Sequence, residues 1–203
     1  MIKVNLFSLF FALFVNTLFA QDDVISAIRQ EYNDYSKLIE NSKEEGLDFF
    51  PPGFEINTVQ NRPALGPVAI KITYYYTEIG DEEEPDWYKN QAVIRKVIYI
   101  ESMPSYKDYR EFFYNESGQI LFYYSKLTGY SCGEKRLYFS NGKLIKIKFN
   151  PLEGADCIGD EKFPDFTRLT GKLTKDDLDW EKWVLDKAKI HVKAIESLYK
   201  GTQ

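Results

Sequence analysis

The chain has 203 residues and carries 26 basic against 31 acidic side chains, a net charge of −5. This acidic balance argues against nucleic acid and against anionic membrane surfaces as partners, because both attract basic faces. The length is typical of one domain with a substantial core.

The first 20 residues have the layout of a secretory signal peptide, with a short basic start, an apolar middle and a small residue at the cut. The apolar run from Val4 to Val15 spans roughly 12 residues, whereas a membrane span needs roughly 20. The cut would follow Ala20. We therefore expect residues 21–203 to form one secreted or periplasmic domain with no stable membrane insertion.

Both cysteines, Cys132 and Cys157, lie in the exported part of the chain. An even pair in an oxidising compartment favours a disulfide. The alternative is a metal pair, but two thiolates with one distant histidine do not make a zinc site. We therefore predict a bridge that closes a loop of about 25 residues, and no metal.

Residues Val24 to Glu45 predict an amphipathic helix. Asp22 or Asp23 is placed to cap its start, and Gly46 to end it. Its apolar residues recur at steps of three and four, which places them on one face. They are Ile25, Ile28, Tyr32, Tyr35 and Ile39.

Strands are expected after a proline-rich stretch. The chain from Phe49 to Pro67 holds four prolines, which predicts a loop or a short edge strand. Val68–Thr77 alternates apolar with polar residues, and Val93–Glu101 follows as a second strand. The acidic run Asp81–Asp86 between them predicts a solvated loop, with a Ca²⁺ site as the alternative.

Four more strands follow closely. Asn141-Gly142 favours a type I′ hairpin turn, in which both central residues have positive φ. Asn115–Gly118 is a second turn. Connections this short require antiparallel neighbours. The four segments are Tyr109–Tyr114, Ile120–Ser125, Glu134–Phe139 and Leu144–Phe149.

The C-terminal helix is expected to begin at Thr174, where Asp177 forms a near capping box, and to end before Gly201. Trp183 and Ile190 fall nearly opposite its main apolar arc. At 100° per residue, that arc holds Trp180, Val184, Ala188, His191, Val192, Ile195, Leu198 and Tyr199.

These elements predict an α+β fold, an antiparallel meander sheet of about six strands with the N-terminal and the C-terminal helix packed on one face. The other face would stay partly open, and it would be rich in tyrosine. Tyr75 on the polar side of its strand and Trp183 are expected to be exposed. Such aromatic surfaces are typical of binding faces, and strand propensity alone is the alternative explanation. The candidate binding residues are Tyr75, Tyr99, Tyr123, Tyr138 and Trp183.

Two hairpins repeat one pattern. Phe113–Ile120 and Tyr138–Ile145 share the order aromatic, turn, Gly, polar, aliphatic, and their glycines are 24 residues apart. Residues 109–149 thereby resemble the MORN-type (membrane occupation and recognition nexus) hairpin repeats of bacterial exported proteins, although the glycines that follow the second strand of those repeats are missing. The resemblance implies a scaffold or partner-binding sheet. Two ordinary hairpins would give the same pattern.

No catalytic or cofactor motif stands out. His191, the single histidine, lies on the apolar arc with no carboxylate near it on that arc, so we expect it to pack in the core against one hydrogen-bond partner. A pair of carboxylates brought together by the fold is the one catalytic arrangement that the sequence leaves open.

We therefore expect a non-enzymatic exported bacterial domain without a cofactor, which binds an envelope protein or a saccharide through a tyrosine-rich sheet face. The alternatives are a small carboxylate-based hydrolase and an exported immunity-type protein. A flat aromatic patch would favour binding, whereas a deep pocket with two close carboxylates would favour catalysis.

Overall fold

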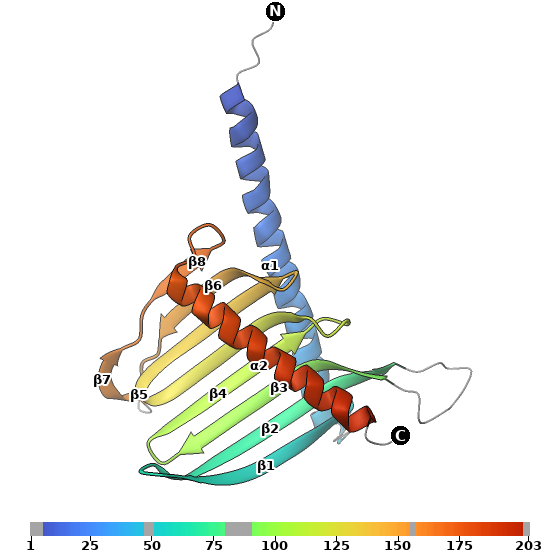
Figure 1. Ribbon diagram of the computed structural model, residues 1–203, viewed down its shortest axis with the longest axis vertical. Coiled ribbons are helices and arrows are strands. Elements are labelled where there is room, and N and C mark those ends of the chain that lie inside the picture. Colours follow the sequence, from blue (N-terminus) through green and yellow to red (C-terminus); the bar gives the residue numbers. More distant parts are fainter. Residues whose placement is uncertain (1–5, 47–50, 80–90, 155–156, 201–203) are drawn as a thin grey trace, which may run out of the picture.

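One sheet of eight strands lies between two helices (Figure 1). The computed structural model describes residues 6–46, 51–79, 91–154 and 157–200, with the side chains of residues 21–46, 51–79, 91–129, 132–154, 157 and 163–198. The elements are α1 (Leu6–Glu44), β1 (Gly53–Arg62), β2 (Gly66–Ile79), β3 (Gln91–Met103), β4 (Tyr106–Tyr114), β5 (Ile120–Ser140), β6 (Lys143–Pro151), β7 (Cys157–Lys162), β8 (Phe166–Leu169) and α2 (Lys175–Lys200).

The described strands follow the order β1-β2-β3-β4-β5-β6-β8, and each neighbouring pair is antiparallel. β7 pairs with β5 in parallel. The expected α+β fold with an antiparallel sheet is confirmed, but the sheet has eight strands instead of about six. β1 is a 10-residue edge strand inside the proline-rich stretch, because the prolines flank it and none falls within it. The acidic run Asp81–Asp86 lies outside the described residues.

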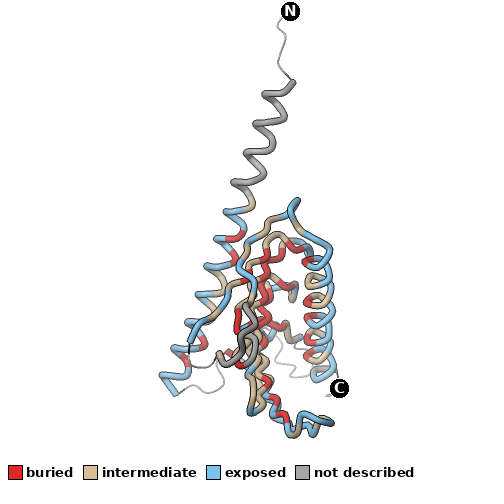
Figure 2. The backbone as a smooth tube through the Cα atoms, turned by 90° about the vertical axis from the view of Figure 1, so that its left-hand side faces the viewer, coloured by how far each residue is buried: buried red, intermediate tan, exposed pale blue. Residues whose placement is uncertain are grey.

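The two helices cover opposite faces of the sheet (Figure 2). Phe112 packs in the core cluster that contains Val184 of α2, whereas its neighbour Phe113 packs in the cluster that contains Ile25 of α1. The expectation that both helices share one face is therefore wrong. The central strands carry consecutive aromatic residues, so both of their faces are apolar and each needs a helix to cover it.

β5 folds back on itself, although its 21 residues form one continuous strand element. The Tyr124 hydroxyl donates to Glu134 Oε1 at 3.0 Å, and the rings of Phe122 and Tyr138 lie 4.9 Å apart. Residues 16 apart on one straight strand would be separated by about 50 Å. β5, one of the eight strands, therefore bends so that its two halves lie side by side, and these halves correspond to the predicted segments Ile120–Ser125 and Glu134–Phe139.

Local turn and capping chemistry agrees with the sequence. Asn141 and Gly142 have φ values of 51° and 71°, which confirms the type I′ turn. At the start of α2, the Thr174 amide donates to Asp177 Oδ2 at 2.8 Å and the Asp177 amide donates to Thr174 Oγ1 at 3.4 Å, which confirms the capping box. α1 instead begins at Leu6, so neither Asp22 nor Asp23 caps it.

The predicted disulfide is present. Cys132 and Cys157 are bridged, with their Cα atoms 5.6 Å apart, and the bridge joins β5 to the start of β7. In the part of the chain that the structure describes, neither helix offers a stretch that is apolar and long enough to cross a lipid bilayer.

Candidate functional site

The five aromatic residues proposed from the sequence do not share one face of the sheet. Tyr75 and Tyr138 point toward α1, whereas Tyr99, Tyr123 and Trp183 lie on the side of α2. Tyr123 and Tyr138 are only 1% and 3% exposed, and each belongs to the core on its own side. The five residues therefore do not make one binding surface.

Tyr75 and Trp183 are expected to be solvent-facing, but Tyr75 is buried and Trp183 is half-buried. Tyr75 is 8% exposed, and the Lys43 ammonium of α1 lies 5.9 Å from its ring centroid. The half-buried Trp183 packs edge-on against Tyr123, with ring centroids 5.9 Å apart. Tyr75 is buried because α1 covers its face of the sheet. Trp183 is half-buried because the flank of α2 that carries it also contacts the sheet.

Tyr99 and Trp183 nevertheless meet on either side of one guanidinium. Tyr99 lies directly opposite Arg110 in the β3–β4 ladder. The Arg110 guanidinium carbon is 4.9 Å from the Tyr99 ring centroid and 5.3 Å from that of Trp183. Asp108 Oδ2 accepts hydrogen bonds from Arg110 Nε, at 3.0 Å, and from Nη2. The guanidinium is thus held in place by two rings and one carboxylate.

Glu101, which lies next to this group, accepts hydrogen bonds from three side chains. Arg62 binds it with both terminal nitrogens, at 2.8 and 3.2 Å, and the Tyr99 hydroxyl donates to it at 2.7 Å, as does the Tyr106 hydroxyl. Burial alone would raise the pKa of Glu101. The hydrogen bonds from Tyr106, Tyr99 and Arg62 outweigh burial and lower that pKa to about 2.

Lys135 lies in an aromatic cage on the same side of the sheet. Its ammonium is 3.7 Å from the Trp180 ring centroid and 5.4 and 5.5 Å from those of Phe163 and Phe149. Among the described residues it makes no ion pair, and burial lowers its pKa to about 8. Phe163 can reach this cage only because residue 133 is glycine, since a Cβ there would lie 2.0 Å from the phenyl ring.

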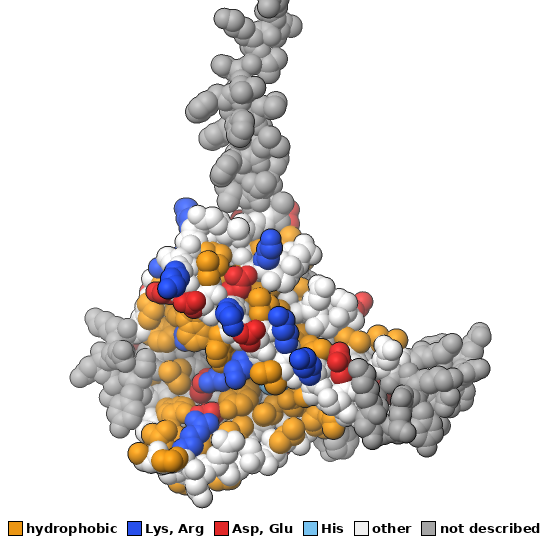
Figure 3. Space-filling view, viewed as in Figure 1, with side chains coloured by type: hydrophobic (Ala, Val, Ile, Leu, Met, Phe, Trp, Pro, Cys, Tyr) orange, Lys and Arg blue, Asp and Glu red, His pale blue; other side chains and the backbone are white. Residues whose placement is uncertain are grey.

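These groups line the part of the sheet that α2 leaves uncovered as it crosses the strands diagonally (Figure 1). Figure 3 shows basic and acidic side chains among hydrophobic ones on this part of the surface. We name it the open corner. Its residues are Arg62, Tyr99, Glu101, Tyr106, Asp108, Arg110, Lys135, Trp180 and Trp183.

The open corner also holds two neighbouring carboxylates, since Glu101 and Asp108 are directly opposite in the β3–β4 ladder. A glycoside hydrolase needs one carboxyl group with a raised pKa as its acid. Glu101 has a lowered pKa, and Asp108 is engaged by Arg110. Glu101 therefore does not suit the role of the acid in the hydrolase alternative.

His191 is a packed core residue, as expected. Its Nδ1 lies 3.0 Å from the Tyr74 hydroxyl, the side chain is 8% exposed, and burial lowers its pKa to about 4. A neutral imidazole can accept the tyrosine hydrogen at that nitrogen. Within the described ranges, no three His, Cys, Asp or Glu side chains converge on a point that could hold a metal ion.

Sequence reasoning found Tyr99 and Trp183 but missed their charged partners. Alternation along β4 carries a usable signal, because Asp108 and Arg110 fall on the same side as the core residue Phe112. Lys135 gives no such signal. Its place depends on the aromatic residues that α2 and the chain after β7 bring to it.

Comparison of the chain with models of known protein families, with curated proteins and with solved structures found no match.

Proposed function

We propose that this protein is a non-enzymatic, exported binding domain that contacts a partner protein through the open corner. The observation that carries the proposal is the Arg110 guanidinium held between Tyr99 and Trp183, beside a lysine with no ion pair among the described residues. Trp, Tyr and Arg are the residues most enriched in binding hot spots.

The internal contacts of the open corner support a role in binding. Arg62 and Arg110 are already oriented by Glu101 and Asp108, so little side-chain entropy would be lost when a partner docks. Lys135 is left as the unpaired charge. We therefore expect the partner to place an acidic side chain against Lys135. A saccharide, which would stack on Trp180 and Trp183, is the alternative outcome of the test.

Three further features agree with the proposal. The signal-peptide pattern of residues 1–20 and the Cys132–Cys157 bridge both suit an oxidising compartment outside the cytoplasm. The resemblance of residues 109–149 to MORN-type hairpins implies a scaffold or partner-binding sheet. An exported immunity-type protein would be one special case, in which the partner is a toxin.

The test is capture of a partner from envelope extract by the mature chain, followed by affinity measurement with the protein identified. Lys135→Glu reverses a charge without breaking an ion pair among the described residues, and it should weaken binding at least about tenfold. Lys189→Glu makes the same charge change on an exposed position of α2 outside the open corner and should bind as the wild type does. Equal affinities of the two variants would contradict the proposal.

A further inference from the structure

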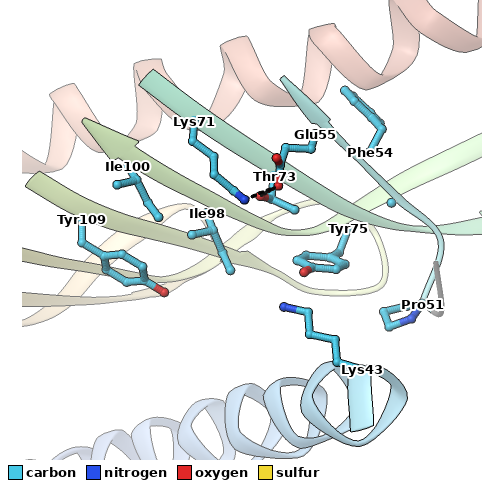
Figure 4. Close-up of a pocket in the computed structure, with 11 residues that line it drawn as sticks. Lys43, Pro51, Phe54, Glu55, Lys71, Thr73, Tyr75, Ile98, Ile100 and Tyr109 are labelled. Atoms are coloured by element: carbon cyan, nitrogen blue, oxygen red, sulfur yellow. Dashed lines mark hydrogen bonds and ion pairs between the residues drawn. The ribbon is translucent and has the colours of Figure 1, made fainter. Parts of the chain in front are cut away.

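A second site lies on the other face of the sheet. A cavity of about 470 Å³, open to solvent on one side, lies between the end of α1 and strands β1 to β4 (Figure 4). This volume is within the range of pockets that take small molecules, roughly 300–1,000 Å³. The cavity shares none of its lining residues with the open corner, so what it binds is a separate question from the proposed function.

The floor of the cavity is apolar and elongated. Ile98 and Ile100 project from β3, with Tyr109 directly opposite Ile100 on β4 and Thr73 directly opposite Ile98 on β2. Neighbouring strands are about 4.8 Å apart, so a floor that crosses four strands is about 14 Å long. Both isoleucines remain half-buried under α1. A slot of this shape fits an extended apolar chain better than a compact ligand.

The charges gather at one end of the slot. Lys43 from α1 extends toward the Tyr75 ring, and Lys71 projects from β2 at the rim (Figure 4). Among the lining residues that the structure describes, Glu55 is the only carboxylate, and it pairs with Lys71 at 2.5 Å. Lys43 has no carboxylate partner among the described residues. Counted over the described lining residues Lys43, Lys71 and Glu55, the β1–β2 end of the slot therefore carries one positive charge in excess.

At the opposite end, Tyr109 has its hydroxyl occupied, because it donates to Glu111. Glu111 is in turn held by Lys96 Nζ at 2.9 Å and by the Tyr32 hydroxyl at 2.6 Å. This network leaves the ring of Tyr109 to the cavity. The slot thus has a cationic end and an apolar body, which is the complement of an amphipathic anion.

We propose that this cavity binds a medium-chain fatty acid, with the alkyl chain on Ile98, Ile100 and Tyr109 and the carboxylate beside Lys43. The test uses decanoate as the probe, measured by calorimetric titration of the mature chain. Decanol and decyltrimethylammonium are the matched probes with the same alkyl chain and with no charge or the opposite charge. Decanoate should bind tightest of the three.

Charge variants then locate the carboxylate. Lys43→Gln should weaken decanoate about tenfold and leave decanol unchanged, because a charged hydrogen bond or ion pair of this kind is worth roughly one factor of ten. Glu55→Gln should strengthen decanoate binding, since it releases Lys71. Lys37→Gln, on an exposed position of α1 that does not line the cavity, is the matched control and should change nothing.

A variant whose side chain fills the slot tests whether the ligand binds there. Ile98→Trp should abolish binding of both decanoate and decanol, and its near-ultraviolet circular dichroism and unfolding midpoint show whether the fold persists. Absence of decanoate binding to the wild type would overturn the proposal. So would binding that is indifferent to both Lys43→Gln and Glu55→Gln, or binding that survives in a folded Ile98→Trp variant.

Discussion

His191 makes the stability of the fold depend on pH. Its imidazole packs against Tyr74 and Phe112, and burial, with a smaller effect of Lys187, lowers its pKa from 6.5 to about 4. As the pH falls, the unfolded chain takes up this proton first. The stabilisation is therefore complete above about pH 6.5 and is lost between pH 6.5 and pH 4, with a total of roughly 3 kcal/mol.

Urea unfolding at pH 7 and pH 4.5 checks this expectation. The wild type should lose roughly 2–3 kcal/mol more of its free energy of unfolding between the two pH values than His191→Gln does. The carboxylates titrate alike in both proteins, so the difference isolates the imidazole. The same loss in both proteins would show that His191 is not buried in its neutral form.

Lys135 should be recognisable by its own titration. Burial among Trp180, Phe149 and Phe163 lowers its pKa to about 8, whereas an ordinary lysine titrates near 10.4. In protein whose lysines carry ¹³C-methyl groups, one NMR signal should move near pH 8 and be missing from Lys135→Met. A Lys135 signal that moves with the exposed lysines would mean that the aromatic cage is open to solvent.

At the scale of elements, α2 packs against the sheet through one face of the helix. Ile195 is 1% exposed and Ile190 is 57% exposed, five residues earlier on the same helix. Ile195→Asp buries a carboxyl group with no partner and should cost more than about 3 kcal/mol, or unfold the domain. Ile190→Asp should stay within about 0.5 kcal/mol of the wild type. Chemical unfolding of the two variants distinguishes them, and similar losses would place the helix in a different rotation.

At the scale of the whole molecule, one disulfide bond contributes to the stability of the fold. The Cys132–Cys157 bridge encloses a loop of sequence separation 25 and holds β7 beside β5. Replacing both cysteines by serine should lower the free energy of unfolding by about 3.5 kcal/mol in the chain-entropy model. Amide hydrogens of β7 should then exchange faster than those of β3. An unchanged unfolding midpoint after reduction would contradict this.

Local chemistry was readable from the sequence, whereas long-range packing was not. The Asn141-Gly142 turn and the Thr174–Asp177 capping box depend on neighbours within a few residues, and both are confirmed. The predicted apolar arc of α2 is confirmed at Val184, Ala188, His191 and Ile195, which are buried, but it is wrong at Leu198, which is 50% exposed. The disulfide followed from cysteine number and compartment. The strands β7 and β8, with six and four residues, were too short to show a period.

The two wrong predictions of greatest consequence concern which face of the sheet a side chain or a helix lies on. Runs such as Phe112-Phe113-Tyr114 bury side chains on both sides of the sheet, so strand alternation alone could not say which face α1 covers. The prediction that Tyr75 faces solvent is wrong for this reason, since Tyr75 is 8% exposed. Only part of the open corner could be predicted from the sequence. Arg110 and Trp183 are far apart in the sequence, and only the tertiary fold brings them into contact.

If a partner docks on the open corner, as we propose, the indole N–H signals of Trp180 and Trp183 report on it directly. We expect both signals to shift in a ¹H–¹⁵N spectrum when the captured partner is added to the mature chain, with assignments from single Trp→Phe variants. A partner that binds while both indole signals keep their positions would contradict the account.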